Sequence, residues 1–261
     1  MHFVLFIFIL FFVVIIKSQA EIKKIEAACR IVAEILESLK SFLKAGITTA
    51  DIETYTEKHI RQRNAIPAFK GYRGYPSSIC TSVNNQVVHG IPSRSVKLKN
   101  GDIISIDLGV VLDGFYGDGA ITVPIGDVGA EALKLMKVTE EALYIGIASA
   151  VVGNRVSDIS AAVQGHVEAN GFSVVRAFVG HGIGRSLHED PQVPNFGRPG
   201  QGQRLKDGMT LAIEPMVNAG TPGVEILDDG WTAITADGSL SAHFEHTIAL
   251  TTDGPKILTK I

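Results

Sequence analysis

Two aspartates lie in a stretch of small and apolar residues, and their spacing predicts that they share a site. Asp107 and Asp118 stand eleven positions apart in IDLGVVLDGFYGD, residues 106–118. Asp113-Gly114, between them, is typical of the two-residue type I′ turn of a β-hairpin. With this turn the two aspartates become diagonal neighbours on one face, at most about 7–8 Å apart. Buried carboxylates that close repel each other unless a proton or a cation lies between them, so a metal ion is the natural candidate.

A simpler interpretation is that Asp107 caps a strand and that Asp118 is a solvated residue at a sheet edge. Two more acids in apolar strands favour a metal site, since Glu214 lies in LAIEPMV and Glu245 lies in HFEHTIAL. One acid in such a run usually faces solvent, whereas several of them require a common partner. The pattern therefore predicts a site for one metal ion or for two.

The histidines supply a candidate nitrogen ligand. His181 lies in the glycine-rich stretch GHGIGR, which we expect to be a loop whose backbone can approach a ligand closely. His188 follows in SLHEDP, and His89 comes after an apolar run in VVHGIP. A lone histidine near glycine is more often structural, but acids that already need cations favour His181 as a ligand. Carboxylates with one imidazole suit Mn, Fe(II), Co or Zn. The other histidines have less pointed settings: His2, His59, His166, His243 and His246.

Composition sets the broad class. The chain has 261 residues, 46% of them hydrophobic, which is enough for one large domain or two small ones with a substantial core. A net charge of -3 gives no basic field for nucleic acid or for an anionic membrane surface. The only cysteines, Cys29 and Cys80, form neither a disulfide framework nor a cysteine zinc site, which indicates a reduced compartment.

The N-terminus allows more than one interpretation. Residues 3–16 are all apolar, too short a run to span a bilayer with ease but long enough for the core of a secretory signal. Ser18-Gln19-Ala20 would then be a cleavage site, although no Lys or Arg precedes the apolar run. Ser18 and Glu21 also form a capping box, which predicts the start of a helix at the same place.

The elements that must hold these residues form an α+β pattern. An apolar stripe at helical spacing predicts a helix from the Ser18 cap to a stop at Gly46, and a second helix runs from Thr48 or Thr49 to Arg63. Two further helices are expected at 130–152 and 157–169. Strands are expected at 79–83, 103–111, 115–123, 172–178, 209–217 and 243–251. Helices clustered between two strand-rich blocks favour a mainly antiparallel sheet, with no internal domain boundary.

The motifs resemble those of the type I methionine aminopeptidases. They are SVNNQVVHGIP (82–92), GDIISIDLGVVLDGFYGD (101–118), GHGIGRSLHEDPQV (180–193), AIEPMVNAG (212–220) and DGWTAITADGSLSAHFEHT (229–247). The similarity runs from about Ile15 to the C-terminus. It implies the pita-bread fold, an α+β architecture in which a mainly antiparallel curved sheet carries helices on its outer face and encloses a central cleft with two metal ions.

The resemblance also implies a ligand set. Asp107 matches the bidentate ligand of one metal, and His181 matches the sole imidazole ligand. Glu214 matches the partner of His181 on the second metal. Asp118 and Glu245 match the two carboxylates that bridge both ions. The cofactors expected from this set are two divalent cations, Co, Mn, Fe(II) or Zn.

The implied activity is metal-dependent removal of the N-terminal methionine from nascent proteins, with a small second residue preferred. In the family a hydroxide that bridges the metals attacks the first peptide bond. Glu214 would transfer the proton to the leaving nitrogen, His188 would stabilise the oxyanion, and His89 would orient the amide. The positions that match the family's methionine pocket are Tyr72, Tyr75, Cys80, Leu187 and Trp231. Leu187 replaces the usual Phe, and Phe69 stands where bacterial members often have Cys, so both could reshape the pocket.

Three competing functions remain open at this point. Prolidase and aminopeptidase P share the fold and ligands but normally carry a sizeable extra N-terminal domain. Type II methionine aminopeptidases carry a late helical insertion, whereas only 25 residues separate His188 from Glu214. A non-catalytic pita-bread binding protein that has lost its metals would show substituted ligands, and all five of the expected ligands are present.

The resemblance divides the chain into an apolar N-terminal extension, residues 1–14, and a single catalytic domain, residues 15–261. The extension could come from an upstream start assignment, act as a signal or anchor, or pack locally. The expected location is the cytoplasm, with export or membrane anchoring through residues 1–16 as the alternative. The expected partners are peptide or nascent-protein N-termini and the ribosome, and the expected state is a monomer.

Overall fold

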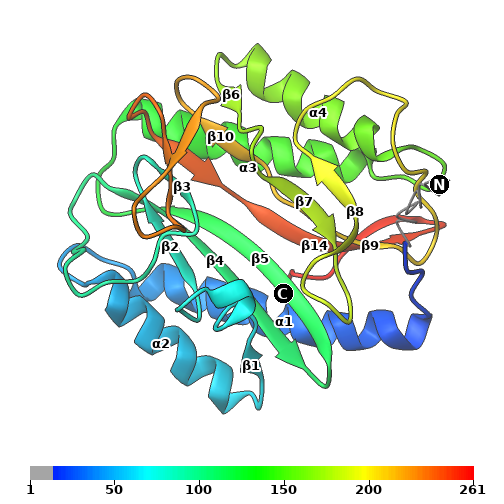
Figure 1. Ribbon diagram of the computed structural model, residues 1–261, viewed down its shortest axis with the longest axis horizontal. Helices are drawn as coiled ribbons and strands as arrows, with labels where there is room; N and C mark the ends of the chain where they lie inside the picture. The colour runs from blue at the N-terminus through cyan, green and yellow to red at the C-terminus, as the bar shows by residue number, and fades with distance from the viewer. Residues whose placement is uncertain (1–13) are drawn as a thin grey trace, which may run out of the picture.

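The computed structural model describes residues 14–261, which form four α-helices packed on antiparallel sheets (Figure 1). The helices are α1 (Gln19–Phe42), α2 (Thr49–Gln62), α3 (Ala130–Ser149) and α4 (Val156–Ala169), with one 3-10 turn, η1, at Tyr72–Gly74. The strands in the first half are β1 (Ile66–Pro67), β2 (Cys80–Val83), β3 (Gln86–Val88), β4 (Ile103–Leu112) and β5 (Phe115–Pro124). Those in the second half are β6 (Ser173–Val174), β7 (Val179–Gly182), β8 (Glu189–Pro194), β9 (Thr210–Ile213), β10 (Met216–Asn218), β11 (Val224–Ile226), β12 (Ala233–Thr235), β13 (Ser241–His243), β14 (Glu245–Thr251) and β15 (Gly254–Ile257).

One large sheet organises the molecule. Its nine strands follow the order β1-β4-β5-β14-β9-β7-β8, with β2 added on β4 and β15 on β14. Two small sheets, β13-β10-β6 and β11-β12-β3, lie beside it. In Figure 1, α1 and α2 lie along the β4–β5 half and α3 and α4 lie along the other half. One apolar core fills the space under each pair of helices, so the sheet is supported on both sides of its centre.

The first helix begins as the sequence predicts. The Ser18 hydroxyl accepts the Glu21 N–H, and the Glu21 carboxylate accepts the Ser18 N–H, which completes the capping box. The helix ends at Phe42, short of the predicted stop, because Leu43 is already extended and Gly46 lies in the turn beyond it. The backbone of α1 at Ala28 and Cys29 contacts Gly117 of β5 so closely that a Cβ there would lie 2.5 Å from the Cys29 nitrogen. This contact seats the helix against the hairpin.

The β4–β5 hairpin has the predicted turn and register. Asp113 and Gly114 form the turn, with φ angles of 49° and 77°. Asp107 pairs with Ala120, and Asp118 pairs with Gly109, so the two aspartates are diagonal neighbours on one face. The interpretation of Asp118 as a solvated edge residue is wrong, because the residue is only 4% exposed and β5 is an internal strand.

Three of the predicted strands are shorter in the structure, and in each case the chain passes from one sheet to another. The prediction of one strand at 209–217 is wrong, because β9 in the large sheet ends before Glu214-Pro215 and β10 continues in a small sheet. Pro215 has no N–H for a sheet hydrogen bond, so the chain can leave the first sheet there. The strand predicted at 243–251 changes sheets at Phe244, between β13 and β14. The strand predicted at 172–178 stops after Val174, and β7 then starts in the large sheet.

A further correction concerns His181. His181 lies on β7, not in a loop, and pairs with Ala212 of β9.

Within residues 14–261, no helix combines the length and the apolar character needed to cross a bilayer. The predictions made for residues 1–13, a start assignment, a signal or an anchor, lie outside the described residues.

A buried ion pair ties the start of the described chain to the segment that carries His188. The Lys17 ammonium donates to Glu189 Oε2 at 2.5 Å, and both side chains are at most 5% exposed. The other oxygen, Oε1, accepts the N–H groups of Arg185 and Ser186. Glu189 therefore closes the turn that precedes it, and Lys17 neutralises its charge.

We expect Lys17→Met to lower the free energy of unfolding by about 3 kcal/mol, because it leaves the Glu189 carboxylate buried without a cation. The matched control is Lys23→Met, at an exposed position of α1, for which a change within about 0.5 kcal/mol is expected. Urea titration of both variants measures the difference. Equal stability of the two variants would contradict a structural role for the ion pair.

Candidate metal centre

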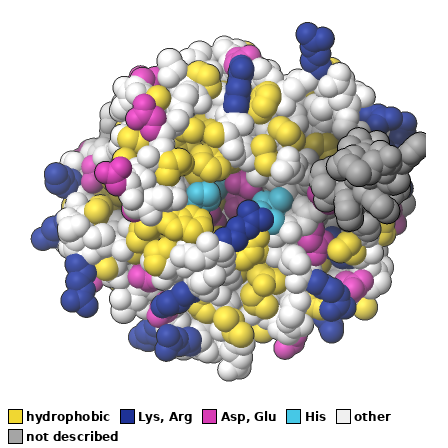
Figure 2. All heavy atoms as spheres, viewed as in Figure 1, with side chains coloured by type: hydrophobic (Ala, Val, Ile, Leu, Met, Phe, Trp, Pro, Cys, Tyr) yellow, Lys and Arg dark blue, Asp and Glu magenta, His cyan; other side chains and the backbone are white. Residues whose placement is uncertain are grey.

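The acids and histidines singled out in the sequence meet in one cleft in the middle of the large sheet. Figure 2 shows its mouth, where histidine side chains flank acidic ones and hydrophobic side chains surround them. The cleft holds about 500 Å³ of empty space, its open mouth included. Its polar lining residues are Asp107, Asp118, His181, Glu214, Glu245, His89 and His188. Each acid comes from a different strand or strand junction, so only the folded sheet assembles the group.

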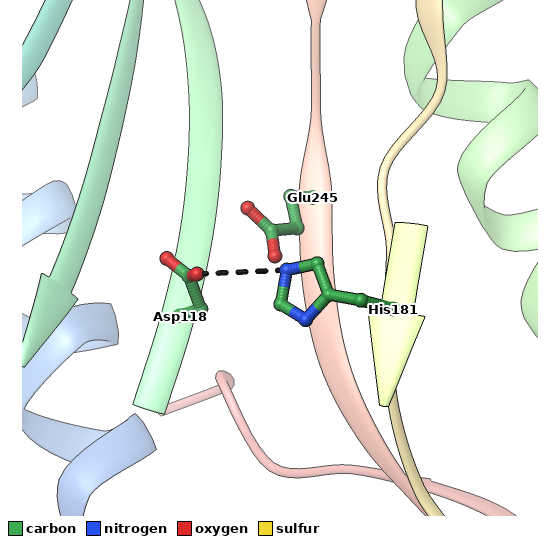
Figure 3. Close-up of side chains that lie close together, drawn as sticks. All are labelled: Asp118, His181 and Glu245. Carbon is green, nitrogen blue, oxygen red and sulfur yellow. Dashed lines mark ion pairs between the residues drawn. The ribbon is translucent and has the colours of Figure 1, made fainter. Parts of the chain in front are cut away.

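Three of these residues form the tightest cluster, drawn in Figure 3. Asp118 projects from β5, His181 from β7 and Glu245 from β14, and each offers one ligand atom within 4.8 Å of the other two. All three residues are at most 5% exposed. Such a set of two carboxylates and one imidazole matches the ligand chemistry of a divalent transition metal.

The tautomer of His181 is fixed by the backbone. Its Nδ1 lies 2.9 Å from the carbonyl oxygen of Gly182, which can only accept, so Nδ1 carries the proton. The lone pair of Nε2 is therefore free and faces the acids, at 3.9 Å from Asp118 Oδ2 and 3.6 Å from Glu214 Oε1. A carbonyl on the far nitrogen is the usual way in which proteins orient a metal-binding imidazole.

Asp107 and Glu214 complete the acidic lining without joining the tightest cluster. Asp107 lies on β4, and its Oδ1 is buried with no hydrogen-bond partner among the described residues. Glu214 occupies the junction between β9 and β10, where its side chain is 14% exposed. The break in the strand thus places a carboxylate at the centre of the sheet, facing the hairpin.

The electrostatics of the metal-free cleft are unfavourable to charged acids. Burial, followed by the negative charge of neighbouring carboxylates, raises the pKa values of Asp118 and Glu245 well above the ordinary range. Burial and then Glu214 do the same to the pKa of Asp107. Burial alone raises the pKa of Glu214 to about 8. Each of these shifts would reverse if a cation lay between the carboxylates.

The cleft fits a divalent cation. Asp107 Oδ1 and Glu245 Oε1 are buried and have no hydrogen-bond partner within residues 14–261, although buried polar atoms are nearly always paired. Burial lowers the pKa of His181 to about 4, so its imidazole is neutral and ready to bind a metal. Unsatisfied carboxylate oxygens beside a neutral imidazole are what a cation-binding site requires.

Two more histidines face the same space. The Tyr72 hydroxyl lies 2.8 Å from His188 Nδ1. Partial burial of the ring, followed by nearby positive groups, lowers the pKa of His188, although the residue as a whole is exposed. His89 has a φ of 61°, and its ring packs edge-on against Phe178 and Trp231. Burial, then His243, lowers the pKa of His89 to about 4. Both rings are neutral hydrogen-bonding groups at the rim of the acidic floor.

The predicted methionine-pocket residues also gather at this cleft. Tyr72, Tyr75, Cys80, Leu187 and Trp231 line it together with Phe69. Tyr75 packs edge-on against Trp231, with ring centroids 5.1 Å apart. Leu187 is 2% exposed and belongs to the same apolar cluster as Phe69, Tyr75 and Cys80. The cleft therefore has an apolar wall beside a polar floor.

The sequence analysis missed one residue at the site, His243. It ends β13, is 1% exposed, and places Nε2 at 3.4 Å from Glu214 Oε2. His243 stands two positions before Glu245, and a histidine so close to a candidate ligand in the sequence was the available signal.

Comparison with known proteins gives consistent results. The model of metallopeptidase family M24 matches residues 23–252. A methionine aminopeptidase of Clostridium perfringens is 55% identical over 95% of this chain and 99% of its own. Methionine aminopeptidase 1 of Bacillus subtilis is 52% identical over 95% of this chain and 100% of its own.

Solved structures agree with the sequence matches. The crystal structure of a methionine aminopeptidase from Thermotoga maritima superposes with a TM-score of 0.94 at 46% identity, covering 95% of this chain and all of that one. A prolidase from Pyrococcus furiosus has a TM-score of 0.76 at 22% identity, and the match covers 95% of this chain and 66% of that one. The second likeness concerns the fold alone. The expected curved antiparallel fold with helices on its outer face is confirmed.

Proposed function

The chain belongs to the methionine aminopeptidases of metallopeptidase family M24, and we propose how its residues hydrolyse the peptide bond after an N-terminal methionine. The protein is a metal-dependent hydrolase that removes N-terminal methionine. The observation that carries the proposal is the meeting of four acids and one imidazole in a single cleft, with two buried carboxylate oxygens that lack a partner among the described residues, beside an apolar wall. We propose two divalent cations, Co, Mn, Fe(II) or Zn, held by Asp107, Asp118, His181, Glu214 and Glu245.

When bound, the cations would lower the pKa of a water molecule towards neutral pH and would polarise the scissile carbonyl. Glu214 is the residue placed to take up and return a proton. Its carboxylate lies beside the tightest cluster without belonging to it and is 14% exposed, so it can face both a water molecule at the cluster and a peptide in the cleft. Glu214 would carry the proton from the attacking water to the leaving nitrogen.

His188 and His89 act on the substrate itself. The Tyr72 hydroxyl can donate to His188 Nδ1, which leaves the proton of the neutral ring on Nε2. That N–H can then donate to the carbonyl oxygen as negative charge develops there. The ring of His89 makes no hydrogen bond to any of residues 14–261, so it is available to orient the amide on the leaving side.

The apolar wall would hold the methionine side chain. Tyr75 and Trp231 offer ring edges and faces that suit a thioether, and the Cys80 thiol lies beside them. We propose that small second residues are preferred, that nascent chains are the substrates, and that the protein acts as a cytoplasmic monomer, with the ribosome as a partner.

Leu187→Ala is expected to raise KM for Met-Ala-Ser about tenfold, because it removes apolar contact from the methionine pocket. The value of kcat should change less, since Leu187 is apolar and offers no group to the reacting bond. Steady-state kinetics of this variant and of Leu133→Ala, at an exposed position of α3, provide the measurement. An unchanged KM for Leu187→Ala would show that Leu187 does not contact the methionine side chain of the substrate.

The function is tested by the release of methionine from Met-Ala-Ser. Protein treated with a chelator should be inactive and should regain activity with one of Mn, Fe(II), Co or Zn. An Ala-Pro-Ala peptide should not be cleaved. Cleavage of the proline peptide in preference to Met-Ala-Ser would assign an Xaa-Pro peptidase instead. Binding of Met-Ala-Ser without cleavage by any metal form would indicate a peptide-binding protein.

A further inference from the structure

His243 is a buried histidine without an assigned task. Its side chain is 1% exposed, and its Nε2 has no hydrogen-bond partner within the described residues. A buried nitrogen that can donate or accept ordinarily has a partner, and leaving it unpaired costs free energy. The nearest acid to this atom is Glu214, whose Oε2 lies 3.4 Å away. The distance is slightly long for a hydrogen bond and short enough for a small movement to form one.

Glu214 lies between two imidazoles. His181 Nε2 approaches Oε1 at 3.6 Å, and His243 Nε2 approaches Oε2 at 3.4 Å. The two rings therefore lie next to different oxygens of one carboxylate. His181 has its proton fixed on Nδ1, so it cannot donate to Glu214 from Nε2. A donor to this carboxylate has to come from the side of His243.

The backbone holds His243 firmly in this place. Its strand pairs with β10 in a register that sets His243 against Met216, two residues beyond Glu214. The His243 N–H donates to Thr122 Oγ1 at 3.0 Å, and the same hydroxyl donates to the His243 carbonyl at 2.8 Å. The residue is thus fixed both to β10, which follows Glu214 in the chain, and to β5, which carries Asp118.

We propose that His243 is a positioning residue for Glu214, whose Oε2 accepts a hydrogen bond from His243 Nε2–H so that Oε1 stays directed at the metal site. A carboxylate that binds a cation through one oxygen needs a partner on the other, and such partners tune metal affinity. The inference rests on the proposed function, because it assigns Glu214 the role of a ligand.

His243 is better placed to orient Glu214 than to bind a cation itself. The tightest group of ligand atoms contains Asp118, His181 and Glu245 and does not include His243. The acid that lies nearest to His243 Nε2 is Glu214, at the edge of that group. The His243 ring would therefore affect the metal site through Glu214, by donating a hydrogen bond to this ligand.

The test is Co(II) binding by the full chain, measured by calorimetry and by the visible absorption of the ion. His243→Leu replaces the imidazole with an apolar side chain of similar size and so removes the donor, and we expect it to weaken Co(II) binding about 10–100-fold. His243→Gln keeps a donor at similar reach and should restore most of the affinity. His243→Asn is a second variant whose shorter amide should fail to restore it. The kcat for Met-Ala-Ser should fall with affinity while KM stays unchanged.

The matched control is His166→Leu, because His166 also faces a glutamate, with Nε2 at 3.1 Å from Glu141 Oε2, on the surface between α3 and α4. Its Co(II) affinity should equal that of the wild type. Wild-type affinity in both His243→Leu and His243→Asn would overturn the proposal. A Co(II) spectrum that changes coordination in His243→Gln would overturn it too, since it would make His243 a direct ligand. Wild-type protein that binds no Co(II) would instead refute the proposed function.

Discussion

Asp118→Asn is expected to lower kcat/KM for Met-Ala-Ser at least about a thousandfold. The residues of a catalytic centre act as one unit, so removing any one of them abolishes nearly all of the rate enhancement. The same change should stabilise the metal-free protein. Asp118 is buried beside other acids, and burial and Asp107 already raise its pKa. A neutral amide of the same shape removes that unfavourable charge. Activity and stability should therefore move in opposite directions.

The measurement pairs peptide kinetics with urea unfolding in the presence of a chelator. Asp228→Asn, at an exposed position before the β12 strand, is the matched control and should leave both quantities unchanged. Activity within tenfold of the wild type would show that Asp118 is not part of the catalytic centre. A metal-free variant that is less stable than the wild type would show that the carboxylate is not repelled by its neighbours.

The metal-free protein is expected to lose stability as the pH rises from about 7 to 8. This window lies above the titration of the buried histidines, such as His89, His181 and His243, whose lowered pKa values make stability rise with pH only up to the unfolded value of 6.5. Burial raises the pKa of Glu214 from 4.5 to about 8, and the pKa values of Asp107, Asp118 and Glu245 are raised as well. Between the unfolded and folded pKa values the folded state holds a proton that the unfolded state has released. Stability then falls by about 1.4 kcal/mol per pH unit for each such group. The contribution of Glu214 is complete below about pH 4.5 and is gone above about pH 8.

Urea unfolding at several pH values, with a chelator present, measures this slope. Glu214→Gln should have a smaller slope, since it removes one titrating group. Metal-loaded protein should show the opposite trend, because cation binding requires ionised carboxylates and stabilises only the folded state. A metal-free protein whose stability rises over this pH range would contradict the raised pKa values.

Local signals allowed the hairpin to be predicted in detail. The Asp113-Gly114 turn determined which residues pair, and the pairing put Asp107 and Asp118 on one face before any long-range contact was considered. The capping box at Ser18 likewise marked the start of α1, and the start expected at Thr48 or Thr49 agrees with α2. Such features depend on a few neighbouring residues, so they can be read from the chain.

The changes of sheet could not be predicted in this way. Glu214 and Glu245 looked like residues inside continuous strands, because alternation of side chains does not reveal which sheet a strand joins. The structure shows that each acid sits where the chain passes from one sheet to another. His243 was missed because its partner, Glu214, comes from a distant strand.

The placement of the acids on separate strands has a consequence for the order of events during synthesis. The first candidate ligand, Asp107, lies on β4, and the last, Glu245, opens β14. The cluster of Asp118, His181 and Glu245 therefore does not exist until β14 has been made and has paired with β5 and β9. Metallation must follow nearly complete folding, and a growing chain of this protein cannot process an N-terminus, its own included, before that strand is in place.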